Sequence, residues 1–202
     1  MSNFTDFFPA AGGSGGGGFT KRLKYTTARG LDDADYNNAA SYTVNPATDL
    51  GLEDGASLGY FMIGSGVSGT IASPASNRTG GKGGRILQGI AIIATATTDL
   101  VLTPAAATSA SNSQVNTTIT GGLTLNTADG ANTSGFGGTE SDSNRATAAG
   151  NGINGYGVGG RTYNLENGTT GKNYHGFGGG GRVFYTANGT NLAGDGAIIF
   201  FY

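Results

Sequence analysis

The sequence predicts an all-β protein: a small antiparallel β-sandwich or β-prism-like domain with glycine-rich extended loops and no substantial helix. Apolar residues gather in short runs that have the length of a buried strand rather than of a helix. Glycine supplies 40 of the 202 residues, in clusters, against an average share of about 7%. The alanine-rich stretches are short and flanked by Ser, Thr and Gly, which does not favour helix formation.

The strands follow from local patterns along the chain. Residues 41–44 alternate polar and apolar, and Asn45-Pro46 then predicts a turn. Gly89 is a candidate bulge inside an apolar run, and residues 120–122 predict a hairpin turn. The last apolar run, residues 196–202, is expected to be buried, because an exposed apolar strand promotes aggregation. The expected strands are 41–44, 57–63, 85–93, 100–103, 115–119, 123–125 and 196–202.

The N-terminal 18 residues predict an anchor on a tether. Residues 12–18 form a Gly/Ser linker, which behaves as flexible coil. The short peptide before it offers four anchor residues, Phe4, Phe7, Phe8 and Pro9. We expect residues 1–11 to bury these side chains in another protein; the alternative is that they fold back onto their own domain. The β-rich domain then spans residues 19–202.

A glycine-rich insertion at about 135–181 carries isolated aromatic residues without apolar periodicity. Aromatic rings among small polar residues suit adaptable contact with a partner surface or a sugar. The candidate contact residues are Tyr156, Tyr163, Tyr174, His175 and Phe177. The insertion is expected either to pack as extended glycine helices or to form mobile loops.

Composition excludes several classes of function. With 11 basic and 13 acidic residues the chain lacks the positive charge that nucleic-acid binding requires. No apolar stretch is long enough for membrane insertion, and the N-terminus does not read as a secretory signal. There is no cysteine, so there are no disulfides and no thiolate metal site. Only 12% of residues are charged, which indicates a surface covered by assembly, although a monomer kept soluble by Asn and Thr is the alternative.

No motif supports catalysis, a metal or a cofactor. Residues 64–69 fit G-x-G-x-x-G, but the helix and the acidic residue that dinucleotide binding needs do not follow. Asp33, Asp35 and Asn37 begin like a calcium loop whose required Gly and Glu are missing. A solvated acidic turn is favoured there over a surface calcium site of Asp32, Asp33 and Asp35. His175 is the single histidine and has no matched nucleophile.

Three stretches carry a resemblance to a known family: the aromatic N-terminus that runs into glycines, residues 80–84 followed by apolar strands, and the glycine-rich end at 194–202. In these features the chain resembles the glycine-rich tail-fibre and adhesin-like proteins of tailed bacteriophages, in particular marine and cyanobacterial phages. The resemblance implies a structural protein on the outside of the virion. Its residues 1–11 would bind other virion proteins, and its glycine-rich half would contact a host glycan or protein. A homotrimer is expected by analogy with fibres.

Two other functions remain open. A capsid decoration protein or head fibre would use the same anchor and tether. A fibre-borne polysaccharide depolymerase would need two carboxylates at a defined separation, for which Glu140, Asp142 and Glu166 are the candidates.

Overall fold

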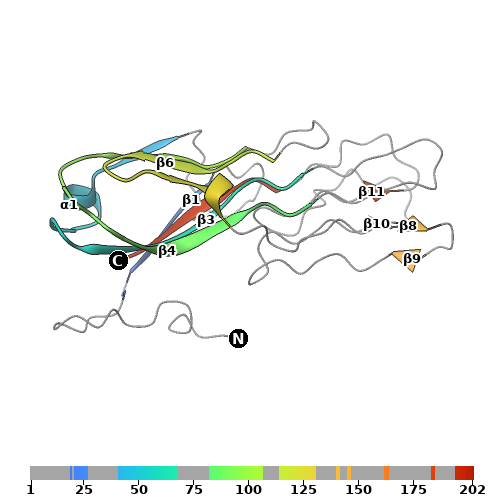
Figure 1. Cartoon of the computed structure of the whole chain (residues 1–202), viewed down its shortest axis with the longest axis horizontal. Helices are drawn as coiled ribbons and strands as arrows, with labels where there is room; N and C mark the ends of the chain where they lie inside the picture. Colours follow the sequence, from blue (N-terminus) through green and yellow to red (C-terminus); the bar gives the residue numbers. More distant parts are fainter. Residues whose placement is uncertain are drawn as a thin grey trace.

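The computed structural model describes residues 19, 21–26, 41–67, 82–106, 114–130, 140–141, 145–146, 162–163, 183–184 and 194–202. Strands dominate these residues, and most of them belong to two four-stranded antiparallel sheets (Figure 1). The expectation of an all-β fold is therefore confirmed. The anchor residues and most of the insertion lie outside the described residues, and the domain boundaries remain a prediction.

The first sheet, which we call the β12 sheet, has the order β1-β12-β3-β4. Its strands are β1 (Arg22–Thr26), β3 (Ser57–Ile63), β4 (Ile86–Ile92) and β12 (Ala197–Phe201). The apolar runs predict β3, β4 and β12 correctly, whereas β1 was not among the expected strands. β12 pairs with β1 on one side and β3 on the other, and apolar clusters on both of its faces bury it along its whole length.

The second sheet, the β5 sheet, has the order β2-β5-β6-β7. Its strands are β2 (Tyr42–Val44), β5 (Leu100–Thr103), β6 (Thr118–Gly121) and β7 (Leu125–Asn126). β6 and β7 form an antiparallel hairpin, as the sequence predicts, but its turn lies at 122–124 instead of 120–122. Thr120 and Gly121 belong to β6, where they pair with Val101 and Leu100 of β5. A single 3₁₀ turn, η2 (Thr127–Asp129), follows β7.

Two sequence expectations about local structure are wrong. Asn45-Pro46 begins the one-turn helix α1 (Pro46–Asp49), in which the Asn45 side chain caps the N–H groups of Ala47 and Thr48. Gly89 forms no bulge, because β3 and β4 pair in unbroken register and Tyr60 lies opposite it. The Tyr60 hydroxyl lies 2.7 Å from the point where a Cβ of Gly89 would stand, so the tyrosine side chain covers the glycine.

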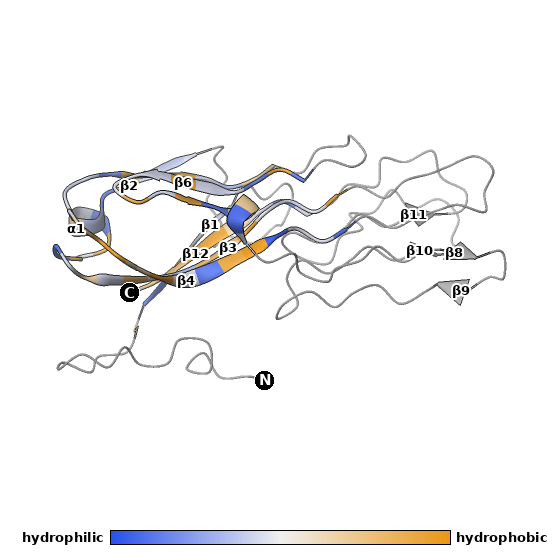
Figure 2. Cartoon of the chain, viewed as in Figure 1, coloured by the Kyte–Doolittle hydropathy of each residue, from blue (hydrophilic) through white to orange (hydrophobic). Residues whose placement is uncertain are grey.

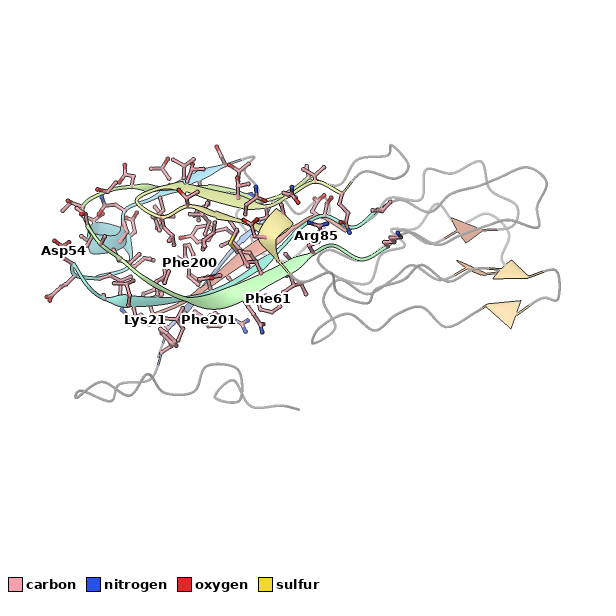
Figure 3. All side chains as sticks on the ribbon, viewed as in Figure 1. Lys21, Asp54, Phe61, Arg85, Phe200 and Phe201 are labelled. Carbon is pink, nitrogen blue, oxygen red and sulfur yellow. The ribbon has the colours of Figure 1, made fainter. Side chains whose placement is uncertain are left out.

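The main core lies between the two sheets. Phe200 and Met62 from the β12 sheet pack with Leu100, Leu102 and Ile119 from the β5 sheet, and all five are fully buried. Figure 3 shows Phe200 between the sheets and Phe61 and Phe201 on the opposite side of the β12 sheet. The domain is therefore a β-sandwich.

The outer face of the β12 sheet is also apolar. Phe61, Ile63, Ile86, Ile199 and Phe201 form a second buried cluster there. Antiparallel sheets commonly turn a polar face to water, and this one does not. In Figure 2 apolar colour marks much of β12 and β4, with a hydrophilic stretch within β4.

Four short strands lie within the glycine-rich part of the chain: β8 (Glu140–Ser141), β9 (Arg145–Ala146), β10 (Thr162–Tyr163) and β11 (Val183–Phe184). β8 pairs with β9 antiparallel, and β10 pairs with β11 parallel. All four lie on the side of the sandwich away from α1 (Figure 1).

Candidate interaction ends of the sandwich

The first end of interest is where the chain enters the sandwich. The Phe19 ring lies on Gly59 of β3, beside Phe201 of β12: a Cβ on Gly59 would stand 3.2 Å from the Phe19 ring and 3.2 Å from the Phe201 Cβ. Phe19 also packs against the outer apolar cluster. The absence of a side chain at Gly59 thus makes room for the ring, and Phe19 fixes the chain directly before β1.

Backbone bonds hold the same end. Lys21 and Tyr202 exchange N–H···O=C bonds of 2.9 and 3.1 Å. The Lys21 ammonium lies 5.5 Å from the centre of the Tyr202 ring, within range of a cation–π contact. Behind them, the Tyr25 ring lies 5.1 Å from that of Tyr42 and 5.8 Å from that of Phe200. Burial, with smaller contributions from Tyr202, Asp49 and Tyr42, raises the pKa of Tyr25 well above its ordinary value.

At the opposite end, five backbone segments run side by side. We call this meeting point the hub (residues 64–67, 82–85, 104–106, 114–117 and 194–196). The N–H of Val67 donates to the carbonyl of Lys82, and that of Gly66 donates to the carbonyl of Gly194, both at 2.9 Å. The N–H of Gly196 donates to the carbonyl of Ala105 at 2.7 Å.

Buried hydroxyls complete the hub. The Thr117 hydroxyl donates to the carbonyl of Ile63 (2.5 Å) and accepts from the N–H of Ala105 (3.0 Å). The Ser65 hydroxyl accepts from the N–H of Val115 (2.9 Å). Thr117 and Ser65 have no exposed surface. Such buried hydroxyls replace the backbone partners that strands lose where they separate.

Close backbone approach explains two hub glycines. A Cβ at Gly84 would overlap the carbonyl oxygen of Gly64. A Cβ at Gly196 would overlap the carbonyl oxygen of Ile63 and the Thr117 hydroxyl. Because the overlapping atoms are mainly backbone, no rotamer change relieves them, and only glycine fits these two positions.

The hub gathers the ends of three connections in the chain. Connection 68–81 leaves after Val67 and returns at Lys82, and these two residues are bonded to each other. Connection 107–113 returns at Gln114, whose side chain donates to the carbonyl of Gly83 at 2.6 Å. Connection 131–193 starts beyond η2 and returns at Gly194, which is bonded to Gly66. All three connections thus start and finish at or beside this one end.

The two ends are separated by the length of β12. Arg22 pairs with Phe201, and Thr26 pairs with Ala197, which directly follows the hub residue Gly196. Four strand steps of about 3.3 Å place Phe201 roughly 13 Å from Ala197. The chain therefore enters the sandwich at one end, and the three connections, the longest of which contains the glycine-rich insertion, leave from the other.

Most of the predicted site residues lie outside the residues that the structure describes. The anchor residues Phe4, Phe7, Phe8 and Pro9 lie outside the described residues, as do Tyr156, Tyr174, His175 and Phe177. Tyr163 belongs to β10, where it pairs with Phe184. Sequence reasoning missed Phe19, although its place directly after the glycine tether was a usable signal. Thr117 carried no signal, since nothing in its surroundings distinguishes it from the many other threonines.

The segments that partly match functional motifs have structural roles where the structure describes them. Gly64, Ser65 and Gly66 are hub residues, and Gly66 continues into backbone pairing rather than into a helix. Glu140 begins β8, and Asp142 and Glu166 lie outside the described residues, as does the acidic turn at 32–35. Within the described ranges no three His, Asp or Glu side chains gather as metal ligands.

The described helices are too short to cross a membrane. No protein-family model, no curated protein and no solved structure matches the chain.

Proposed function

We propose that this chain is a structural protein of a tailed-bacteriophage virion, a tail-fibre or adhesin-like component on the outside of the particle. Residues 1–11 bind other virion proteins, and the glycine-rich insertion at about 135–181, within connection 131–193, contacts the host surface, a glycan or a protein. The proposal rests on the resemblance described above. The observation that carries it further is the opposition of the two ends of the sandwich.

An attachment module needs its anchor and its contact surface far apart, so that one does not block the other. In this chain the N-terminal segment enters at Phe19, and the hub collects both ends of each connection at the opposite end. Bonds between residues distant in sequence hold the hub together, and its hydroxyls are fully buried. It is therefore a rigid base for whatever the connections display.

Deletion of residues 1–11 tests the anchor. We expect the number of copies per purified particle, measured by quantitative mass spectrometry, to fall to background. The control is the melting temperature of the purified deletion chain, which should match that of the full chain because the sandwich begins at Phe19. Normal incorporation of the shortened chain would refute the anchor.

Replacement of Tyr156, Tyr174 and His175 by Ser tests the contact surface. We expect adsorption to host cells to fall while the copy number per particle stays constant. Unchanged adsorption would remove the adhesive role. A virion reconstruction then separates the tail from the capsid: a few to a few tens of copies on the tail support the proposal, and hundreds of copies over the shell would identify a decoration protein.

A further inference from the structure

β4 is an unprotected edge strand. It lies at the margin of the β12 sheet, pairs only with β3 and extends over seven residues, Ile86–Ile92 (Figure 1). It contains no charged residue and no proline. Ile90 and Ile92 are 40% and 60% exposed, although most large apolar side chains of the described residues are covered. Natural edge strands usually carry charges, prolines or bulges that prevent pairing with another chain.

The backbone of β4 is open for such pairing. At the two ends of the strand, the Arg85 carbonyl accepts from the N–H of Gly64, and the Ile93 N–H donates to the carbonyl of Ala56, both on the β3 side. Backbone groups alternate in direction along a strand, so Gln88, Ile90 and Ile92 direct their N–H and C=O groups away from β3. Among the described residues these outward groups have no protein partner. η2 approaches only the start of the strand, where Gly130 lies against the Ile86 carbonyl.

The other sheet margins differ from β4 in ways that discourage pairing. β1 carries Arg22 and Lys24 and follows Lys21. β2 has three residues, and β7 has two. An edge that is long, uncharged and apolar therefore occurs among these four margins only at β4.

We propose that the free edge of β4 pairs antiparallel with β4 of a second copy of this chain, about a two-fold axis at Ile90. Ile90 then lies opposite Ile90 of the second copy, and Gln88 lies opposite Ile92. Every outward N–H and C=O of these three residues gains a partner, and the two β12 sheets become one continuous sheet.

A second copy suits this edge better than a charged partner would. The strand has no charge to attract an acidic or basic peptide, and two identical uncharged edges meet without repulsion. Ile90 lies against Ile90 of the other copy and Ile92 lies against Gln88, so both copies contribute the same residues, as an isologous interface requires. The pairing predicts a dimer in place of the trimer expected from the resemblance to fibres. It does not depend on the virion role.

The test is the solution mass of the full chain and of variants at residue 90, measured by light scattering after size exclusion. We expect the unmodified chain at about 40 kDa, twice its mass of 20.1 kDa. Ile90→Lys and Ile90→Glu each place two like charges opposite each other, which destabilises a cross-strand pair. We therefore expect each variant alone near 20.1 kDa at the same concentration.

Mixing the two variants tests the register. Lys on one copy then faces Glu on the other, so the mixture should return to about twice 20.1 kDa. Val101→Lys is the matched control, since Val101 is 37% exposed but lies on β5, inside the other sheet. We expect this control to remain a dimer. The proposal is refuted if the unmodified chain is a monomer or a trimer, if either residue 90 variant alone stays dimeric, if the mixture stays monomeric, or if the control dissociates.

Discussion

Removal of one buried hydroxyl should destabilise the hub measurably. The Thr117 hydroxyl joins three segments, because it donates to the carbonyl of Ile63 and accepts from the N–H of Ala105. Thr117→Val keeps the shape of the side chain and replaces this oxygen with a methyl group. The Ile63 carbonyl and the Ala105 N–H each lose their bond to this hydroxyl. Because Thr117 has no exposed surface, water does not replace the lost bonds.

The magnitude follows from the cost of leaving buried polar groups without a partner. Each such group costs about 1–3 kcal/mol, so the loss of both bonds should lower the free energy of unfolding by about 2–6 kcal/mol. For a chain of this size, 1 kcal/mol corresponds to about 2–4 °C in melting temperature. We therefore expect a decrease of roughly 4–24 °C.

Differential scanning calorimetry of the purified chain measures this decrease. Thr120→Val is the matched control, since Thr120 lies on the neighbouring strand β6 with an exposed side chain. Its melting temperature should stay within about 2 °C of the unmodified chain, as is usual for surface substitutions. If Thr117→Val melts at the same temperature as Thr120→Val, the hydroxyl does not hold the hub and our reasoning about this end fails.

Other substitutions probe the core, the close backbone approach, the helix cap and a buried phenol. Phe200→Ala should lower the free energy of unfolding by about 3–5 kcal/mol in urea titrations, because a fully buried ring leaves a cavity. Gly84→Ala should cost at least about 1–3 kcal/mol in the same titration, since its Cβ would overlap backbone. Asn45→Ala should cost about 1 kcal/mol by removing the cap of α1, again by urea. Burial raises the pKa of Tyr25 above 10.0. The contribution of its neutral phenol to the free energy of unfolding is therefore complete below pH 10 and is lost as the pH rises toward the raised pKa. Tyr25→Phe should flatten the decline of melting temperature above pH 10.

Much of the sandwich could be predicted because its central strands are continuous apolar runs. β3 and β12 are buried on both faces, so their sequences carry little polarity and are easily recognised. β1 was not predicted because it is an edge strand that contains the charged residues Arg22 and Lys24 and therefore has no apolar run. It becomes a strand by pairing with β12 across a sequence distance that no local pattern reveals.

The interaction ends were harder to predict than the fold. Glycine enrichment pointed to close backbone packing, but it could not tell which glycines meet backbone. Gly84 and Gly196 meet it in the hub, whereas Gly89 lies under Tyr60. Asn45-Pro46 fits a turn and a helix start equally well. In the fold the Asn45 side chain caps α1 and also bonds to Thr97 and Asp99, which lie far away in the sequence.

The pairing of β1 with β12 also sets how the sandwich bears mechanical load. A pull on the residues before Phe19 reaches β1 at Arg22, and a pull on the connection that returns at Gly194 reaches β12 at Ala197. These points lie at opposite ends of two antiparallel strands, so the force runs along the strands while their hydrogen bonds lie across it. All five residue pairs from Arg22–Phe201 to Thr26–Ala197 then resist together in shear, instead of opening one after another.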